Sequence, residues 1–545
     1  MTPWPEQPMS TAPPLASRTA LTRSARPSPK ASLAKRSARS TAAPSASIGI
    51  RARASSRASF QVSPIPIAAS ALISDLPETG YRPAGGAALT RNAEPATLPA
   101  SRTPQQGRVS FGGGLSGALE GIKVLDFTEY VAGPFAGQML ADMGAAVTKV
   151  EPPQGDFWRL TNMVAADESR GFISVNRGKR SVSIDLKTGE GREIVHRAAR
   201  EADVVLSSYR PGVAKRLAVD YETLSALNPR LVYGQNTAFG PEGPYAGKAG
   251  FDLVSQAMTG IIAFESQSTP GPPRSITSAA ITDLLSGMFL AYGVVCALQQ
   301  RHRTGRGQKV DTSLFASGLA MQYRPLLSIE QFDAAPREEL LALVAEARRQ
   351  GRSVDEAVAG RMASGYERPG APAVATNPYY NVYATRDGHM VIACLNNRLR
   401  RAAAAVLGVE DRRLEMNEWD SALLGPDEAA ALNRRIEAAF ASRTTAEWLT
   451  RFEAAGVPCG PVRLTEELFD DPQVQALGMM PEFEHPLLGK LRQVALPIRM
   501  SDARTTAPTP SPLLGQHSRE FLRELGYGDA EAQSLIERKI VRASE

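Results

Sequence analysis

The sequence is poor in the residue types that most often mark redox, metal or disulfide sites. Its 545 residues include three cysteines and five histidines. Cys296, Cys394 and Cys459 are far apart and lack CxxC spacing, which argues against a disulfide framework and against a zinc or other metal site. So few cysteines are typical of a reducing compartment, and a cytoplasmic protein is expected.

Long apolar runs are also lacking. The longest, residues 284–298, is shorter than the roughly 20 residues that a bilayer-spanning helix needs. It is also interrupted by Ser286, Gly287 and Gly293. We therefore predict a buried core helix here and no association with a membrane.

Acidic residues are scarce in residues 1–118, which hold 14 Lys and Arg but only four Asp and Glu. This segment is rich in Ala, Ser, Pro and Arg and poor in large apolar residues, so we predict that it is disordered. It could be a targeting peptide for import into an organelle, a tail that binds nucleic acid, or an extension without a role. The near absence of aromatic residues argues against nucleic acid as a partner, and the lack of amphipathic spacing favours the last alternative.

From residue 119 onward, β-rich runs alternate with helical patterns, which predicts an α/β domain with a parallel sheet. The first strand-to-helix turn, TEYVAGPFAG, lacks the GxGxxG pattern, so a dinucleotide-dependent oxidoreductase loses its main support. A hairpin is predicted over 377–395, with helices over 330–365, 397–455 and around 518–526. The predicted strands are 121–127, 146–151, 181–186, 203–208 and 230–237, and the helices between them are 132–145, 191–202 and 211–218.

Asp283 stands at the start of the longest apolar run, in the stretch SAAITDLLSG. From the pattern alone, a helix N-cap is the favoured interpretation, because aspartate is among the best N-cap residues. A catalytic carboxylate is the alternative. The two roles can coexist, since a helix N-terminus lowers a carboxylate's pKa and offers N–H groups to a developing oxyanion.

The chain from residue 119 to its C-terminus resembles the class III coenzyme A transferases (CaiB/BaiF type), which include formyl-CoA transferase and the carnitine CoA-transferases. The resemblance implies a Rossmann-like large domain, a smaller α+β domain and an interlocked homodimer. The implied division is 119–330 for the first part of the large domain, 331–455 for linker helices and the small domain, and 456–545 for the return to the large domain. The blocks that carry the resemblance are LEGIKVLDFTEYVAGPFAGQMLADMGAAVTKVEPPQGD, NRGKRSVSIDLKTGEGREIV, RPGVAKRLAVDYETLSALNPRLVY, GFDLVSQAMTG, SAAITDLLSGMFLAYG, RHRTGRGQKVD, GVPCGPV and PLLGQH.

In this family an aspartate attacks the acyl-CoA thioester, and Asp283 occupies the matching position. The resemblance implies a transferase that moves coenzyme A from an acyl-CoA donor to a free carboxylic acid. The route would be an aspartyl anhydride and an aspartyl-CoA thioester. No metal and no cofactor beyond coenzyme A or acyl-CoA as substrate is implied. Small dicarboxylates are the expected acids, with succinyl-CoA as a donor.

Further positions match residues that contact CoA in the family. Arg216 also has an independent rationale, because a guanidinium binds phosphate groups well. Two positions depart from the pattern: Pro152 replaces a CoA-binding arginine, and Ala249 replaces a lysine for which the adjacent Lys248 could substitute. The predicted CoA contacts are Val131, Ala132, Ile184, Asp185, Leu186, Lys187, Ser208, Tyr209, Arg210, Arg216 and Lys248.

An acyl-CoA racemase or isomerase of the same fold is the closest alternative. The family's racemases use a histidine and an aspartate in a GHD context to move a proton next to the thioester. The matching stretch here is GFD, so Phe251 replaces the histidine while Asp252 is retained. Phenylalanine can neither accept nor donate a proton, which makes the transferase the favoured function.

Overall fold

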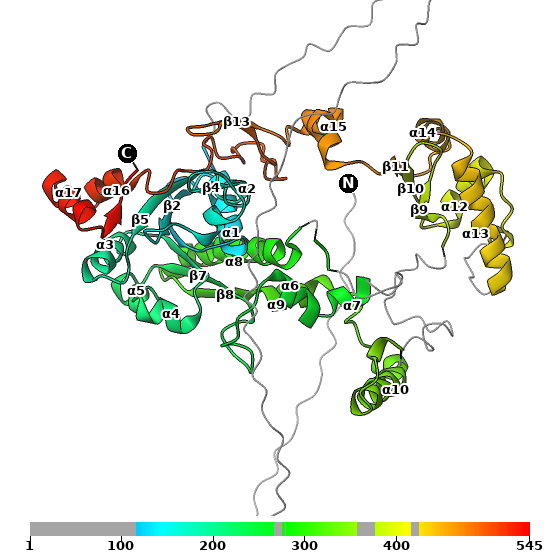
Figure 1. Cartoon of the computed structure of the whole chain (residues 1–545), viewed down its shortest axis with the longest axis horizontal. Coiled ribbons are helices and arrows are strands. Elements are labelled where there is room, and N and C mark those ends of the chain that lie inside the picture. Colours follow the sequence, from blue (N-terminus) through cyan, green and yellow to red (C-terminus); the bar gives the residue numbers. More distant parts are fainter. Residues whose placement is uncertain (1–115, 266–274, 278, 357–376, 416–423, 545) are drawn as a thin grey trace, which may run out of the picture. The chain divides into compact units, whose positions relative to one another are not determined.

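The computed structural model describes residues 116–265, 275–277, 279–356, 377–415 and 424–544. A seven-stranded sheet in the order β14-β5-β2-β1-β6-β7-β8 forms the centre of the α/β part (Figure 1). Neighbouring strands are parallel except for β14, which pairs antiparallel with β5. The strands are β1 (Lys123–Phe127), β2 (Ala146–Glu151), β5 (Lys179–Ile184), β6 (Val204–Ser207), β7 (Val232–Thr237), β8 (Lys309–Ser313) and β14 (Val541–Arg542).

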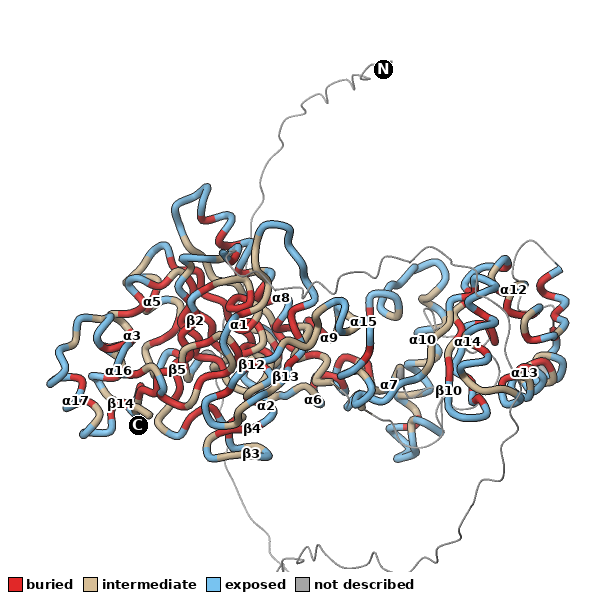
Figure 2. The backbone as a smooth tube through the Cα atoms, turned by 90° about the horizontal axis from the view of Figure 1, so that it is seen from above, coloured by how far each residue is buried: buried red, intermediate tan, exposed pale blue. Residues whose placement is uncertain are grey.

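Helices cover both faces of this sheet, because successive strand side chains point to opposite sides. Val204 and Leu206 of β6 belong to one apolar core, and Val205 belongs to the other. Buried backbone is concentrated in the strands and in α1 (Figure 2). The first core contains α1 (Ala132–Asp142) and α8 (Ile281–Thr304), and the second contains α3 (Gly189–Ala199), α5 (Tyr221–Leu227), α16 (Ser518–Glu524) and α17 (Asp529–Glu537).

The α/β class and the five predicted strands are confirmed. Two strands of the same sheet, β8 and β14, were not predicted, nor was α17 after the last predicted helix. In β8, which reads KVDTS, apolar and polar residues alternate only weakly, and β14 is two residues long. Neither strand therefore carries an apolar pattern of its own. Both are recognised only by their pairing with strands that are distant in the sequence.

Helix α8 is longer than the predicted run and only half-buried. Leu290 and Val294 pack in the core with α1 and the sheet, whereas Met288, Phe289 and Tyr292 are exposed. The predicted buried core helix is therefore confirmed for one face alone. By length and composition alone α8 could cross a membrane, although that test is also passed by core helices.

A separate apolar core lies in the second, smaller part of the chain. The ring of Tyr383 stacks on that of Phe440 with centroids 4.4 Å apart. The predicted hairpin is confirmed, and its second strand also pairs with β11. The elements of this part are β9 (Tyr380–Ala384), β10 (His389–Ala393), α12 (Asn397–Leu407), α13 (Pro426–Ala441), α14 (Thr445–Ala454) and β11 (Cys459–Pro461).

The predicted domain boundaries stay a prediction. The predicted disordered extension lies outside the described residues as far as residue 115; Gly117 is described and forms a bridge with Arg504. The remaining elements are η1 (Phe157–Leu160), β3 (Met163–Ala165), β4 (Glu168–Ser169), α2 (Arg170–Ser174), α4 (Pro211–Arg216), α6 (Asp252–Met258), α7 (Ile261–Glu265), α9 (Leu314–Met321), α10 (Glu330–Arg349), η4 (Arg412–Leu414), η6 (Thr465–Asp470), α15 (Pro472–Leu477), β12 (Glu482–His485) and β13 (Gly489–Arg492).

Candidate active site

A cavity of about 350 Å³ opens where β1, β6 and β7 end. From β1 the chain builds the sheet outward through β2 and β5, and then returns to place β6 on the other side of β1. The carboxyl ends of strands at such a reversal are where open α/β sheets bind ligands. The lining residues are Glu129, Tyr130, Val131, Ala132, Gly133, Ser208, Tyr209, Arg210, Val213, Asn236, Thr237, Ala238, Ala246, Lys248, Ala249, Gly250, Phe251, Asp283 and Leu314.

Asp283 lies in this cavity as the third residue of α8. The N-cap position belongs to Ala280, so the N-cap interpretation of Asp283 is wrong. The carboxylate that caps the helix is that of Asp252, which accepts hydrogen bonds from the backbone N–H and the hydroxyl of Thr282, at 2.8 and 2.7 Å. Another residue therefore serves as the cap, and the Asp283 carboxylate makes no capping hydrogen bond within the described residues.

Helix α8 is held close to the ends of β7 and β1. The Asn236 amide donates to the Ser286 hydroxyl at 2.9 Å, and that hydroxyl donates to the Asp283 carbonyl at 3.0 Å. One turn after Asp283, a Cβ at Gly287 would lie 2.5 Å from the Ala132 carbonyl oxygen. A glycine is therefore needed for the first turns of α8 to approach the start of α1 this closely.

Burial raises the pKa of Asp283 to about 7, with a further contribution from the negative charge of Asp252. The sequence had predicted a lowered pKa from the helix N-terminus, and that prediction is wrong. Within the described part of the chain, no hydrogen bond to the Asp283 carboxylate offsets its loss of water. A carboxylate with a raised pKa and no hydrogen bonds is a stronger nucleophile than one in water.

The loop after β1 supplies Glu129, Tyr130 and Val131 to the lining of the cavity. Its Tyr130 has a φ of +69°, a left-handed conformation that is unfavourable for a bulky side chain. Two polar contacts hold it there: the Tyr130 N–H donates to Asp156 at 3.2 Å, and the Glu129 N–H donates to Ser208 at 3.0 Å. Burial raises the pKa of the Glu129 carboxyl, and nearby Asp156 raises it further.

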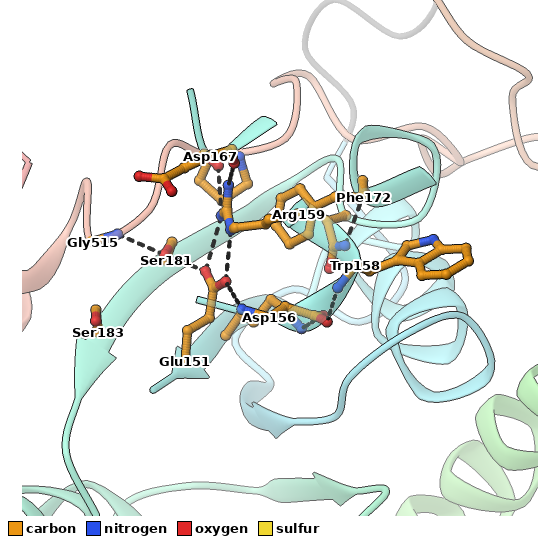
Figure 3. Close-up of polar contacts among 12 residues, drawn as sticks. Glu151, Asp156, Trp158, Arg159, Asp167, Phe172, Ser181, Ser183 and Gly515 are labelled. Atoms are coloured by element: carbon orange, nitrogen blue, oxygen red, sulfur yellow. Dashed lines mark hydrogen bonds and ion pairs between the residues drawn. The ribbon is translucent and has the colours of Figure 1, made fainter. Parts of the chain in front are cut away.

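A buried polar network around Glu151, Asp156 and Arg159 (Figure 3) supports this loop, because Asp156 accepts from the Tyr130 N–H. The Arg159 guanidinium donates two hydrogen bonds to Glu151, at 2.7 and 2.9 Å, and one to Glu168 at 2.7 Å. Glu151 in turn accepts from the N–H of Asp156, which also forms an ion pair with Lys149 at 2.9 Å. The network therefore fixes the carboxylate that holds Tyr130 in place.

The structure brings six of the predicted CoA contacts together with Asp283 around one cavity. These are Val131, Ala132, Ser208, Tyr209, Arg210 and Lys248. They come from three separate loops, after β1, β6 and β7. Ala249, at the position of the missing lysine, lines the same cavity. Their contacts with CoA stay a prediction.

The other predicted contacts lie outside the cavity lining. The side chains of Ile184 and Leu186 are buried in the core with α3. Asp185 accepts from the backbone N–H of Lys187 at 3.0 Å. Arg216 is exposed at the end of α4. If Ile184 and Leu186 contact CoA, they do so through backbone atoms, because their side chains face the core.

Sequence reasoning missed Glu129, Tyr130 and Asn236 as lining residues. Their signal was available, since each lies at or just after the end of a predicted strand, where ligands bind in such sheets. Among the described residues, no group of three His, Cys, Asp or Glu side chains could hold a metal ion.

Replacing Asp252 by asparagine tests how this residue acts on Asp283. The amide oxygen can still accept from Thr282, but its negative charge is gone, so we expect the pKa of Asp283 to fall by roughly one unit or less. The rise of kcat/KM with pH should shift to lower pH by the same amount. Glu193→Gln, an acid-to-amide change on the other face of the sheet, is the matched control and should leave the profile unchanged. An unchanged profile in Asp252→Asn would contradict this coupling.

The fold and the cavity define an α/β protein with a buried carboxylate, that of Asp283, in a cavity at the carboxyl ends of its parallel strands. Residues 119–518 match the model of CoA-transferase family III, and the chain belongs to this family. It is 32% identical over 426 residues to a succinyl-CoA:glutarate CoA-transferase of Mus musculus, covering 77% of this chain and 89% of that protein. It is 33% identical over 429 residues to a formyl-CoA:oxalate CoA-transferase of Streptomyces coelicolor, covering 77% and 98%.

Solved structures are also similar to this chain in sequence and in fold. A CaiB/BaiF family protein from Brucella suis is 31% identical, with a TM-score of 0.60, covering 75% of this chain and 100% of that one. Rv3272 from Mycobacterium tuberculosis is 28% identical, with a TM-score of 0.58 over the same shares. The predicted resemblance is therefore confirmed in both sequence and fold.

Proposed function

We propose that this enzyme transfers coenzyme A from an acyl-CoA to a free carboxylic acid, with Asp283 as the nucleophile. One observation carries the proposal: a carboxylate without hydrogen bonds from the described residues lies in the cavity at the strand ends. Relatives named as transferases between succinyl-CoA and glutarate or mesaconate support the same class of substrates.

The reaction proceeds in four balanced steps. An Asp283 carboxylate oxygen attacks the thioester carbon, and the C–S bond breaks with its electron pair leaving on CoA thiolate. The thiolate attacks the Asp283 carboxyl carbon of the resulting anhydride and releases the first acid as a carboxylate. The incoming carboxylate then attacks the aspartyl-CoA thioester, and the returning thiolate takes the new acyl group and frees Asp283. No net proton, electron or metal is required.

The test is to incubate the purified protein with acetyl-CoA or succinyl-CoA and a panel of free acids, with EDTA present. We expect new CoA esters by mass spectrometry, and parallel lines in double-reciprocal plots because the first acid leaves before the second binds. Release of free CoA without a new ester would contradict the proposal. A racemase would instead exchange the hydrogen next to the thioester with D₂O, so exchange without ester formation would favour that alternative.

We also propose that the active species is a homodimer, interlocked as the family resemblance implies. Large apolar side chains are exposed along two helices beside the cavity: Met288, Phe289, Tyr292 and Val295 on α8, and Leu253, Val254 and Met258 on α6. Water contact of so many apolar groups is unfavourable, and a second copy would cover them. Sedimentation at micromolar concentration should show twice the chain mass, and a monomer would contradict the proposal.

A further inference from the structure

Four aromatic side chains gather at one wall of the Asp283 cavity. The Tyr130 ring centroid lies 5.3 Å from that of Phe251, 5.8 Å from Phe157 and 6.0 Å from Trp158. Tyr130 and Phe251 line the cavity itself. We call Tyr130, Phe157, Trp158 and Phe251 the aromatic wall.

Specific hydrogen bonds and a buried ion pair hold the aromatic wall in place. One Asp156 oxygen accepts hydrogen bonds from the backbone N–H groups of both Tyr130 and Trp158, at 3.2 and 2.9 Å. Its other oxygen forms the ion pair with Lys149, and both partners are fully buried. A strained backbone at Tyr130 and a buried ion pair are both costly, so a binding role is the physical reason to retain them.

The wall lies beside the nucleophile. Asp252 is hydrogen-bonded to Thr282 through both the backbone and the side chain. Phe251 directly precedes Asp252, and Asp283 directly follows Thr282. This tie therefore brings the Phe251 ring and the Asp283 carboxylate to the same cavity, which they both line.

The charged side chains that line the cavity also bear on which acids it can bind. Its two cations, Arg210 and Lys248, come from the loops after β6 and β7, and the Lys248 ammonium lies 4.3 Å from the centroid of the Tyr245 ring. Of the charged residues that line the cavity, Glu129 directly precedes Tyr130, and Lys248 lies three residues before Phe251 on the same loop. A substrate group that rests on the wall therefore meets mainly the apolar rings of Tyr130 and Phe251, which offer no hydrogen-bond partner to a second carboxylate.

We propose that the aromatic wall binds the part of the substrate acid beyond its carboxylate, and that the enzyme prefers acids with an aryl or branched apolar group over short dicarboxylates. This rests on the proposed CoA transfer and names its substrate class. It differs from the dicarboxylates expected from sequence and from the acids in the names of the relatives reported above. The rings supply apolar contact area, and edge-to-face packing suits an aryl group.

The experiment compares two acceptors, 3-phenylpropanoate and glutarate, which carry an aryl ring and a second carboxylate at the end of a short methylene chain, against one donor that the acid panel has shown to work. We expect kcat/KM for 3-phenylpropanoate to be about tenfold or more above that for glutarate, as a well-filled apolar pocket allows. Phe251→Ala should lower the value for 3-phenylpropanoate by about tenfold and leave that for glutarate nearly unchanged. Glu129→Gln should raise the value for glutarate.

Leu487→Ala is the matched control, because Leu487 is 51% exposed, close to the 57% of Phe251, but lies outside the cavity lining and outside the faces of α6 and α8 proposed to contact the second copy. It should not change the ratio between the two acids. The proposal is overturned if wild type prefers glutarate, or if Phe251→Ala lowers both acids equally. It is also overturned if Phe251→Ala changes only the sedimentation of the dimer, which would mean that a second copy covers the wall. In each of these cases CoA transfer itself still stands, whereas no ester with any acid would overturn the proposed function.

Discussion

Asp283→Asn is expected to lower kcat by about a thousandfold or more while making the folded protein more stable at pH 8. The amide has nearly the same shape but is a poor nucleophile, so the covalent relay cannot begin. Losses of this size are usual when a covalent nucleophile is removed. Binding of acyl-CoA should be retained, because the cavity shape is kept.

The gain in stability follows from the raised pKa of Asp283. The pKa is about 7 in the folded state and 3.8 in the unfolded state, so between these values the folded state binds the additional proton. Stability therefore falls as pH rises through this window, by at most about 4 kcal/mol above pH 7. Asparagine has no charge to bury, so its free energy of unfolding should exceed that of wild type at pH 8 and match it near pH 4.

Urea unfolding at pH 4 and 8, together with the ester assay, measures both effects. Glu120→Gln removes an exposed carboxylate and should change neither activity nor the pH dependence of stability. If Asp283→Asn keeps transfer activity, the aspartate is not the nucleophile. If it is inactive but equally destabilised at both pH values, the loss comes from misfolding rather than from chemistry.

Arg159→Gln is expected to be the most destabilising single change in the network of Figure 3, at about 3–5 kcal/mol. The guanidinium is fully buried and pairs with two carboxylates, and it also donates to the carbonyl of Pro512. Without the guanidinium, Glu151 and Glu168 remain buried carboxylates, and the glutamine that replaces Arg159 carries no positive charge to pair with them. Burial already raises the pKa of Glu168 to about 7 despite the guanidinium.

The loss should be larger at pH 8 than at pH 5.5, because protonation relieves the unpaired carboxylates at lower pH. Arg180→Gln is the control: Arg180 pairs with Glu524 at 2.9 Å near the surface, and such pairs contribute about 0–1 kcal/mol. Equal losses in the two variants, measured by urea unfolding, would contradict the account of the network. Arg159 positions Asp156 through Glu151, and Asp156 in turn holds the aromatic wall. Any Arg159→Gln protein that still folds should therefore also lose the preference among substrate acids that the wall sets.

Much of the fold could be predicted because its strands are short apolar runs with helical patterns between them. Val204 to Ser207 and Val232 to Thr237 are examples in which local pattern and final structure agree. β14 could not be predicted, because its two residues are recognised as a strand only beside β5. The exposed face of α8 could not be predicted for a related reason. The composition of a helix does not reveal which of its faces has no other element packed against it.

The candidate site was predicted in part. Asp283 and the loops after β1 and β6 were found through the family resemblance, but the pattern around Asp283 favoured a cap. The actual cap, Asp252, lies 30 residues before Thr282, which donates to it, so local rules could not assign it. The pKa of Asp283 was predicted with the wrong sign, because burial outweighs the helix N-terminus and burial is a tertiary property.

The most direct test of the central claim is to trap the covalent intermediate on Asp283. Wild-type protein is mixed with a donor acyl-CoA in the absence of an acceptor, treated with borohydride, digested and sequenced by mass spectrometry. An aspartyl-CoA thioester is reduced to an alcohol, so the account predicts that the Asp283 side chain is converted to a primary alcohol in a donor-dependent manner. An unmodified Asp283 under conditions that support ester exchange, or modification of another carboxylate in its place, would contradict it.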